Sequence, residues 1–116
     1  LPYLDELDLL ERPKFRFAFS LYTDLPKEVI TLDSQSVNEK SDRERLVKFL
    51  ENIEQYISYG TDIPEDVLGG ILQATRFSWK SSTRILLLLG DAPEHGKDFH
   101  DLPPSWDNYY DDKKHP

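Results

Sequence analysis

The feature that most constrains the fold is the apolar segment Ile85–Leu89, which follows Arg84 and stops at Gly90 and Asp91. Its aliphatic residues are continuous and do not alternate with polar ones, a pattern typical of a central parallel strand buried on both faces. Such strands alternate with helices that cover the sheet. The segment therefore predicts an α/β fold with a strand at Arg84–Leu89.

Two further strands are predicted upstream. In Phe15–Tyr22 the large apolar residues alternate with smaller or polar ones, which indicates a strand with one strongly apolar face. Val29–Leu32 is short enough to be an edge strand, and we expect it to run antiparallel. Before Pro13, leucines at helical spacing (Leu4, Leu7 and Leu10) predict the end of an amphipathic helix.

Two helices are expected on the faces of this sheet. A capping box formed by Ser41 and Glu44 precedes a stripe of aliphatic residues and predicts a helix near Asp42–Ile57, ending about Tyr59 and Gly60. A second helix is predicted over Pro64–Thr75, because proline suits the first helical position. The paired glycines at 69–70 weaken this helix, so we expect them to allow close packing against the sheet.

Length and composition narrow the class of protein. The 116 residues are one domain at most, and 22 acidic against 14 basic residues give a net charge of −8, which would repel nucleic acid. There are no cysteines to form disulfides or thiolate metal sites. The longest apolar segment is too short for a membrane span, so no membrane insertion is expected. We predict a partial domain over residues 1–100 and a polar loop or tail over residues 101–116.

Acidic residues gather where this sheet would bind a ligand. Asp91 comes just after a parallel strand, and ligands of open parallel sheets bind outside the carboxyl ends of the strands. Asp62 and Glu65 precede a helix whose N-terminus should point to the same edge. Converging carboxylates repel one another unless a cation neutralises them, and oxygen ligands select Mg²⁺ or Ca²⁺. The alternative for Asp91 is a simple turn cap.

Two separated motifs carry a family resemblance. "GTDIPEDVLGGILQA" and "TRILLLLGDAPEHG" resemble the von Willebrand factor A (VWA) family, with similarity to integrin β I-like domains and to the VWA domains attached to atypical alpha-type kinases. The resemblance implies a three-layer, doubly wound, mostly parallel sheet with an antiparallel edge strand. It also implies a metal-ion-dependent adhesion site, in which Mg²⁺ bridges the domain to an acidic group on a partner protein.

The resemblance assigns candidate ligands residue by residue. Asp91 matches the acid after the central strand, and Glu65 matches an acid that integrin β domains place on the metal. Thr61 lies near a threonine used by other branches, and Asp62 matches a residue that serves a neighbouring calcium site in integrin β. The family's D-x-S-x-S motif is absent, since "DSQS" has the wrong spacing. We therefore expect the first strand and the C-terminal strands to be missing, so that this chain is a fragment with a weak site.

Other functions remain as alternatives. The chain could be a metal-free structural fragment of a larger protein, or a phosphatase-like or phosphoacceptor enzyme, although "GDAPEHG" offers no D-x-D and catalysis is not expected. His95 and His100, with Asp91 and Asp98, could form a zinc cluster, but their loop lacks zinc-site spacing, so solvated loop histidines are favoured. A structural role in the loop is expected for His95. The kinase-associated resemblance favours an intracellular location.

Overall fold

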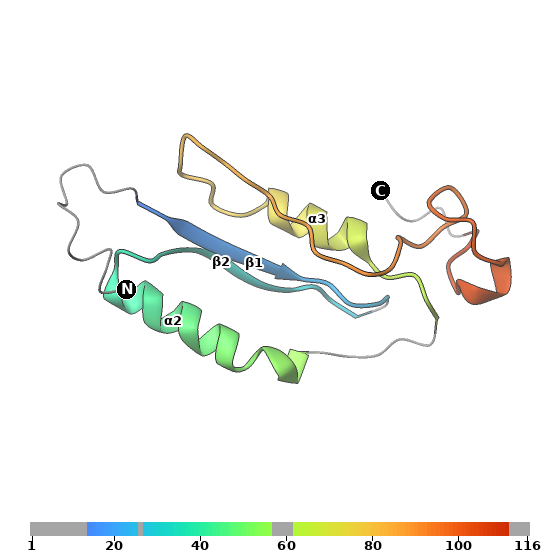
Figure 1. The fold of residues 1–116 in the computed structure, drawn as a ribbon, viewed down its shortest axis with the longest axis horizontal. Helices are drawn as coiled ribbons and strands as arrows, with labels where there is room; N and C mark the ends of the chain where they lie inside the picture. Colours follow the sequence, from blue (N-terminus) through green and yellow to red (C-terminus); the bar gives the residue numbers. More distant parts are fainter. Residues whose placement is uncertain (1–13, 26, 57–61, 112–116) are drawn as a thin grey trace.

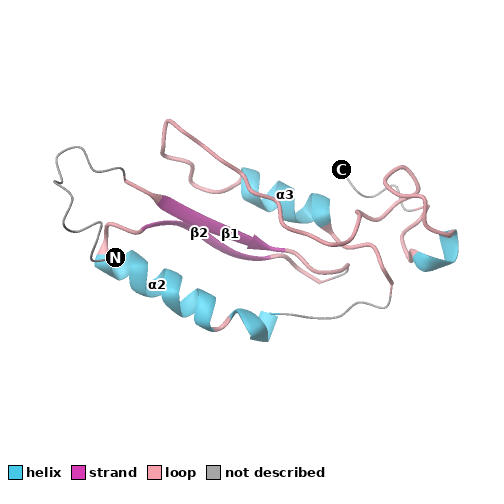
Figure 2. Ribbon diagram, viewed as in Figure 1, coloured by secondary structure: helices cyan, strands magenta, loops and turns pink. Residues whose placement is uncertain are grey.

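The computed structural model describes residues 14–25, 27–56 and 62–111. The chain forms a hairpin of two strands, two α-helices and two short 3-10 helices, and Figures 1 and 2 show the hairpin between the helices. The elements are, in order, β1 (Arg16–Leu21), β2 (Ile30–Ser36), α2 (Lys40–Glu51), η1 (Ile53–Tyr56), α3 (Val67–Thr75) and η2 (Pro104–Trp106).

The two strands pair antiparallel, as expected for the edge strand. Their register runs from Arg16 opposite Ser36 to Leu21 opposite Ile30, with an irregularity between Phe17 and Phe19. The second strand is longer than predicted, because Gln35 and Ser36 continue the ladder with β1 beyond the irregularity. Backbone pairing decided the length of β2, although its side chains are polar at this end.

The helices pack on opposite faces of the hairpin. Neighbouring residues of a strand point to opposite faces, and the ring of Phe19 lies 5.8 Å from that of Phe49 in α2. The next residue, Ser20, donates a hydrogen bond of 2.7 Å from its hydroxyl to the carbonyl of Gly70 in α3. The described part is thus a mixed α/β unit with one helix on each face of the sheet.

Helix α2 does not use the predicted capping box. It begins at Lys40 with Glu39 as the N-cap residue, which makes no side-chain capping hydrogen bond, so Ser41 lies inside the first turn. The carboxylate of Asp42 instead accepts a 2.9 Å hydrogen bond from the backbone of Ser36 and ties the helix to the end of β2. Helix α2 ends at Glu51, and the predicted end near Tyr59 and Gly60 lies outside the described residues.

Helix α3 starts later than predicted. Asp66 is its N-cap and accepts a hydrogen bond from the amide of Gly69, so the buried Pro64 precedes the helix. The prediction of close packing is confirmed for Gly70, where a Cβ would lie 2.5 Å from the ring of Tyr22. A Cβ on Gly69 would instead meet the capping carboxylate of Asp66.

The predicted strand at Arg84–Leu89 is wrong for the described structure. Residues 84–90 have no assigned strand, and Ile85, Leu87 and Leu89 are 78%, 76% and 77% exposed. A parallel strand needs neighbouring strands for its backbone hydrogen bonds, and the sheet in the described part holds only β1 and β2. The doubly wound parallel sheet is therefore not present in the described residues.

Packing among the described residues is loose. Ala74 is the one hydrophobic residue there that is classed as buried, whereas buried polar residues are more numerous. The radius of gyration is 17.6 Å, against about 13 Å for a compact domain of this length. Burial of apolar area, the main stabilising contribution to folding, is consequently small.

The remaining predictions concern the two ends. The helix end predicted before Pro13 lies outside the described residues. In the predicted tail, η2 and the residues around Asp107 pack against the rest of the chain, and Asp107 is buried. No helix in the described ranges is long and apolar enough to cross a membrane.

Candidate functional site

Three segments meet beyond the end of β1. The amide of Asp66 donates to the carbonyl of Thr23 at 2.9 Å, and the amide of Glu65 donates to the carbonyl of Pro93 at 2.8 Å. Glu65 and Glu94 also form an isolated parallel β-bridge. The structure therefore brings together the segment after β1, the segment before α3 and the "GDAPEH" segment.

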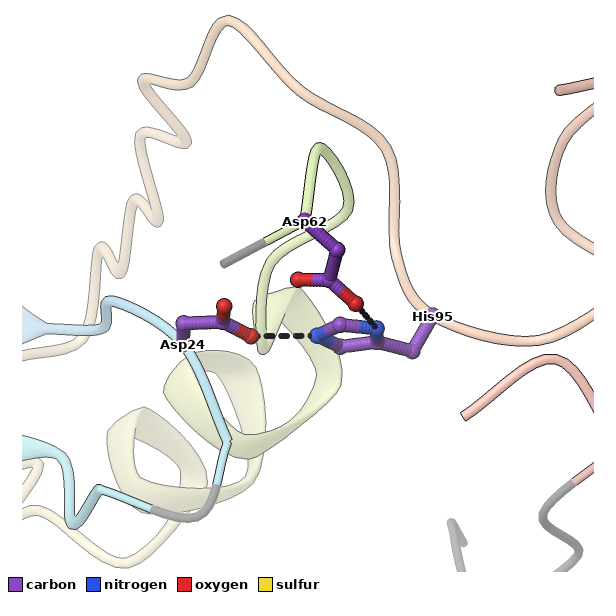
Figure 3. Close-up of side chains that lie close together, drawn as sticks. All are labelled: Asp24, Asp62 and His95. Carbon is purple, nitrogen blue, oxygen red and sulfur yellow. Dashed lines mark hydrogen bonds and ion pairs between the residues drawn. The ribbon is translucent and has the colours of Figure 1, made fainter. Parts of the chain in front are cut away.

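His95 lies at the centre of this junction and is 0% exposed. Its Nε2 lies 2.6 Å from Asp24 Oδ1 and its Nδ1 lies 2.7 Å from Asp107 Oδ1. Figure 3 shows Asp24 facing one nitrogen of the ring and Asp62 lying near the other. Burial would lower the pKa of His95, but the hydrogen bonds to Asp107 and Asp24 outweigh it and raise this pKa above its usual value. The expectation of a solvated histidine is therefore wrong for His95, whose buried ring joins the C-terminal loop to the segment after β1.

Asp107 is the most heavily hydrogen-bonded acid of the junction. Its Oδ2 accepts from the amide of Gly96 and from His100 Nε2, both at 2.7 Å, and its Oδ1 also accepts from the amide of Tyr109. Burial would raise its pKa, but the bonds from His100, Gly96 and His95 hold the pKa of Asp107 well below its usual range. This one carboxylate fixes both histidines to the C-terminal loop.

Asp24 faces Nε2 of the imidazole ring, whereas Asp62 lies near Nδ1, as Asp107 does. Asp62 Oδ2 accepts from the amide of Asn108 at 2.7 Å and lies 3.7 Å from His95 Nδ1. Burial raises the pKa of Asp24, and the adjacent carboxyl of Asp62 raises it further, against the opposing effect of His95. One ligating atom from each of Asp24, Asp62 and His95 lies within 4.8 Å of the other two. We call these three residues the Asp–Asp–His cluster.

The predicted metal ligands divide between two places. Asp91 is exposed and Glu65 is partly buried. Burial raises the pKa of Glu65, and the charge of Asp91 raises it further, so these two carboxylates face a common region. Burial raises the pKa of Tyr22 as well, and the charges of Glu65 and Asp91 raise it further. Asp62 belongs to the Asp–Asp–His cluster, and Thr61 lies outside the described residues.

Sequence reasoning missed Asp24, Asp107 and Glu94. The carboxylate of Glu94 is buried and accepts from the amides of Leu68, at the start of α3, and of His95. Asp24 follows soon after the end of β1, a position similar to that of Asp91 after the predicted strand. Nothing in the local pattern marks Asp107, because its partners lie in a different loop.

Comparison with known proteins gives a similarity in sequence over part of the chain. The chain is 40% identical over 48 residues to "Alpha-protein kinase vwkA" of Dictyostelium discoideum, a match that covers 40% of this chain and 8% of the length of that kinase. No protein-family model matches the chain. No solved structure matches it either.

Proposed function

We propose that this chain is part of a VWA-like protein-binding module that engages an acidic group on a partner through a divalent cation held by Asp91 and Glu65. Thr61 and Asp62 lie shortly before Glu65 in the sequence. The ion is Mg²⁺ or Ca²⁺, because the set contains only oxygen ligands. The proposal concerns binding and assigns no catalytic step to this chain.

The observation that carries this proposal is the electrostatic coupling of Glu65 with Asp91. The two residues are 26 positions apart, yet the β-bridge between Glu65 and Glu94 places their segments together, and the charge of Asp91 raises the pKa of Glu65. Two carboxylates that repel one another at a partly exposed edge gain free energy when a cation binds between them. The exposure of Asp91 leaves room for a partner's carboxylate.

The proposed sheet accounts for the unpaired segment 84–89. This segment runs in the same direction as β1 in Figure 1, and no backbone hydrogen bond of the described residues joins the two. The hydroxyl of Tyr22 donates to the carbonyl of Leu89, which links their ends through a side chain. In the proposed VWA-like arrangement another strand lies between them and makes the sheet mostly parallel.

The similarity to an alpha-protein kinase supports the kinase-associated branch of the VWA resemblance. Because the match covers 8% of that kinase, kinase activity is not proposed for this chain. An intracellular location follows from the same branch and belongs to the proposal.

Titration with Mg²⁺, followed by NMR amide shifts, tests the adhesion site. We expect saturable shifts in the amides near Asp91 and Glu65, with a dissociation constant of about 10⁻³ M or weaker, as for loosely organised oxygen sites. The variants Asp91→Asn and Glu65→Gln should abolish the shifts, while Asp111→Asn, on the exposed C-terminal loop, should leave them unchanged. If wild type and both site variants respond equally, Asp91 is a turn cap and the structural-fragment alternative is favoured.

A further inference from the structure

We infer that the Asp–Asp–His cluster is a second cation site, which takes a transition-metal ion of the Zn²⁺ class through His95 Nε2, a carboxylate oxygen of Asp24 and Oδ1 of Asp62. This site is separate from the Asp91–Glu65 pair and goes beyond the proposed adhesion function. It differs from the oxygen-only set in chemistry, because one of its ligands is an imidazole nitrogen.

The first support is an oxygen that lacks a partner. The side chain of Asp62 is 3% exposed, and its Oδ1 is buried without a hydrogen-bond partner. Figure 3 shows that this oxygen lies on the side of the ring that faces Asp24. A buried acceptor without a donor costs about 1–3 kcal/mol and more when it is charged, so its retention calls for a ligand.

The second support is the charge of the junction. Asp24, Asp62 and Asp107 contribute three buried carboxyl groups, and the ion pairs of these acids within the described residues all go to histidines. His100 Nδ1 accepts a hydrogen bond from the amide of Leu102, and its Nε2 lies 2.7 Å from Asp107 Oδ2. Three carboxyl groups thus lie around His95, and a dication bound to Asp24 and Asp62 would offset part of their negative charge.

The third support is the orientation of the His95 ring. Metal-binding histidines usually donate their other ring N–H to a carboxylate, which fixes the tautomer. Asp107 accepts from Nδ1 at 2.7 Å in this way, so Nε2 points to Asp24. On binding, the ion takes the place of the Nε2 proton, which passes to solvent. The combination of one imidazole with carboxylates suits Zn²⁺, whereas Mg²⁺ and Ca²⁺ prefer oxygen alone.

The test is calorimetric titration of the chain with Zn²⁺, joined to NMR of the histidine ring nitrogens. We expect saturable binding of one Zn²⁺, with a large shift of His95 Nε2 while Nδ1 stays protonated. Asp24→Asn and Asp62→Asn are nearly isosteric and should each weaken binding by more than about tenfold. Asp107→Asn should weaken it by about 10–100-fold, as is usual for the partner of a ligating histidine.

Matched controls separate this site from the adhesion site. Asp98→Asn changes an exposed acid and should leave Zn²⁺ binding unchanged, and so should Asp91→Asn and Glu65→Gln. An excess of Mg²⁺ should not compete. The inference is overturned if wild type shows no saturable Zn²⁺ binding, if the Asp24 and Asp62 variants bind as well as wild type while folded by circular dichroism, or if the His95 nitrogens do not shift. Loss of Zn²⁺ binding only in the Asp91 and Glu65 variants would also overturn it.

Discussion

A single imidazole connects segments that are far apart in the sequence. His95 joins Asp24, 71 positions before it, to Asp107, 12 positions after it, through two short hydrogen bonds. Charge-assisted hydrogen bonds of this kind are roughly twice as strong as neutral ones. Few apolar side chains are buried, and this polar junction joins the C-terminal loop to the segment after β1.

Replacement of Asp107 by Asn should destabilise the fold strongly. The change leaves His95 and His100 without their shared anion, and removal of one partner from a buried ion pair costs about 3–5 kcal/mol. Urea denaturation followed by circular dichroism measures this loss. The control Asp98→Asn removes an exposed carboxylate and should change the free energy of unfolding by less than about 0.5 kcal/mol. Equal stability of the two variants would contradict the role of Asp107.

The same junction predicts how stability depends on pH. The pKa of His95 is raised in the folded state, so its contribution is complete below about pH 6.5, the unfolded value, and is lost as the pH rises through the folded value. The raised pKa of Asp24 has the same sign, but its contribution is complete only below about pH 3.9 and is lost as the pH rises through the folded value. The pKa of Asp107 is lowered, so its contribution is complete above about pH 3.9 and is lost as the pH falls. Stability should be greatest between these limits.

Thermal denaturation in the presence of a chelator measures this dependence. It is carried out at about pH 5, between the unfolded pKa values of Asp and His, and at about pH 8, above both of them. The wild-type midpoint should be lower at the alkaline pH. In His95→Gln the midpoint should be lower at both values and should change less between them. A wild-type midpoint that rises from about pH 5 to about pH 8 would contradict the assignment.

At the scale of elements, α3 is held at both its start and its face. Asp66 and Glu94 accept from its free N-terminal amides, and Gly70 brings its backbone against Tyr22, the residue that follows β1. These capping hydrogen bonds and this close backbone contact take the place of the broad apolar contact that a helix usually makes with a sheet. The position of α3 therefore depends on a few specific contacts.

Replacement of Gly70 by Ala should be destabilising. Alanine favours the helix by about 1 kcal/mol relative to glycine, but the added Cβ would lie 2.5 Å from the Tyr22 ring. Overpacking typically costs about 1–3 kcal/mol, which outweighs the gain in propensity. In a double-mutant cycle with Tyr22→Ala, Gly70→Ala should become neutral or stabilising, because the clash is removed. The absence of coupling between the two positions in urea denaturation would refute this packing.

For the whole molecule, the exposed segment 84–89 is the dominant feature. Its residues 85, 87 and 89 form the more exposed side, and residues 86 and 88 are about half exposed. A contiguous apolar segment of this kind without a packing partner favours association. Folded domains retain only about 5–15 kcal/mol of stability, so the small apolar burial here indicates a marginal fold.

The isolated chain should therefore associate and bind a hydrophobic dye. Ile85→Lys together with Leu87→Lys should reduce both effects, because the charges break the exposed apolar side. The control Val47→Lys changes a single exposed residue on α2 and should have little effect. Analytical ultracentrifugation and dye fluorescence measure the two responses. A soluble wild-type monomer with a sharp, cooperative thermal transition would contradict this prediction.

Local patterns in the sequence determined the elements whose partners are near in the chain. Alternation located β1, helical spacing located α2 and α3, and the short aliphatic stretch after the turn located the antiparallel strand β2. Boundaries were less accurate, because backbone ladders and capping side chains decide where an element ends. Ser41 and Glu44 had the pattern of a capping box, but the hydrogen bond between Asp42 and Ser36 fixed the helix start.

The tertiary structure decided which acids lie around His95 and whether the apolar segment 84–89 forms a strand. Composition and periodicity predicted that Arg84–Leu89 is a buried strand, but a strand exists only where neighbouring strands supply hydrogen-bond partners, and the described residues supply none. The sequence placed Asp62, Glu65 and Asp91 near one edge, yet it did not show that Asp62 turns to His95. That choice depends on Asp24 and Asp107, whose distance from His95 is set only when the three segments fold together.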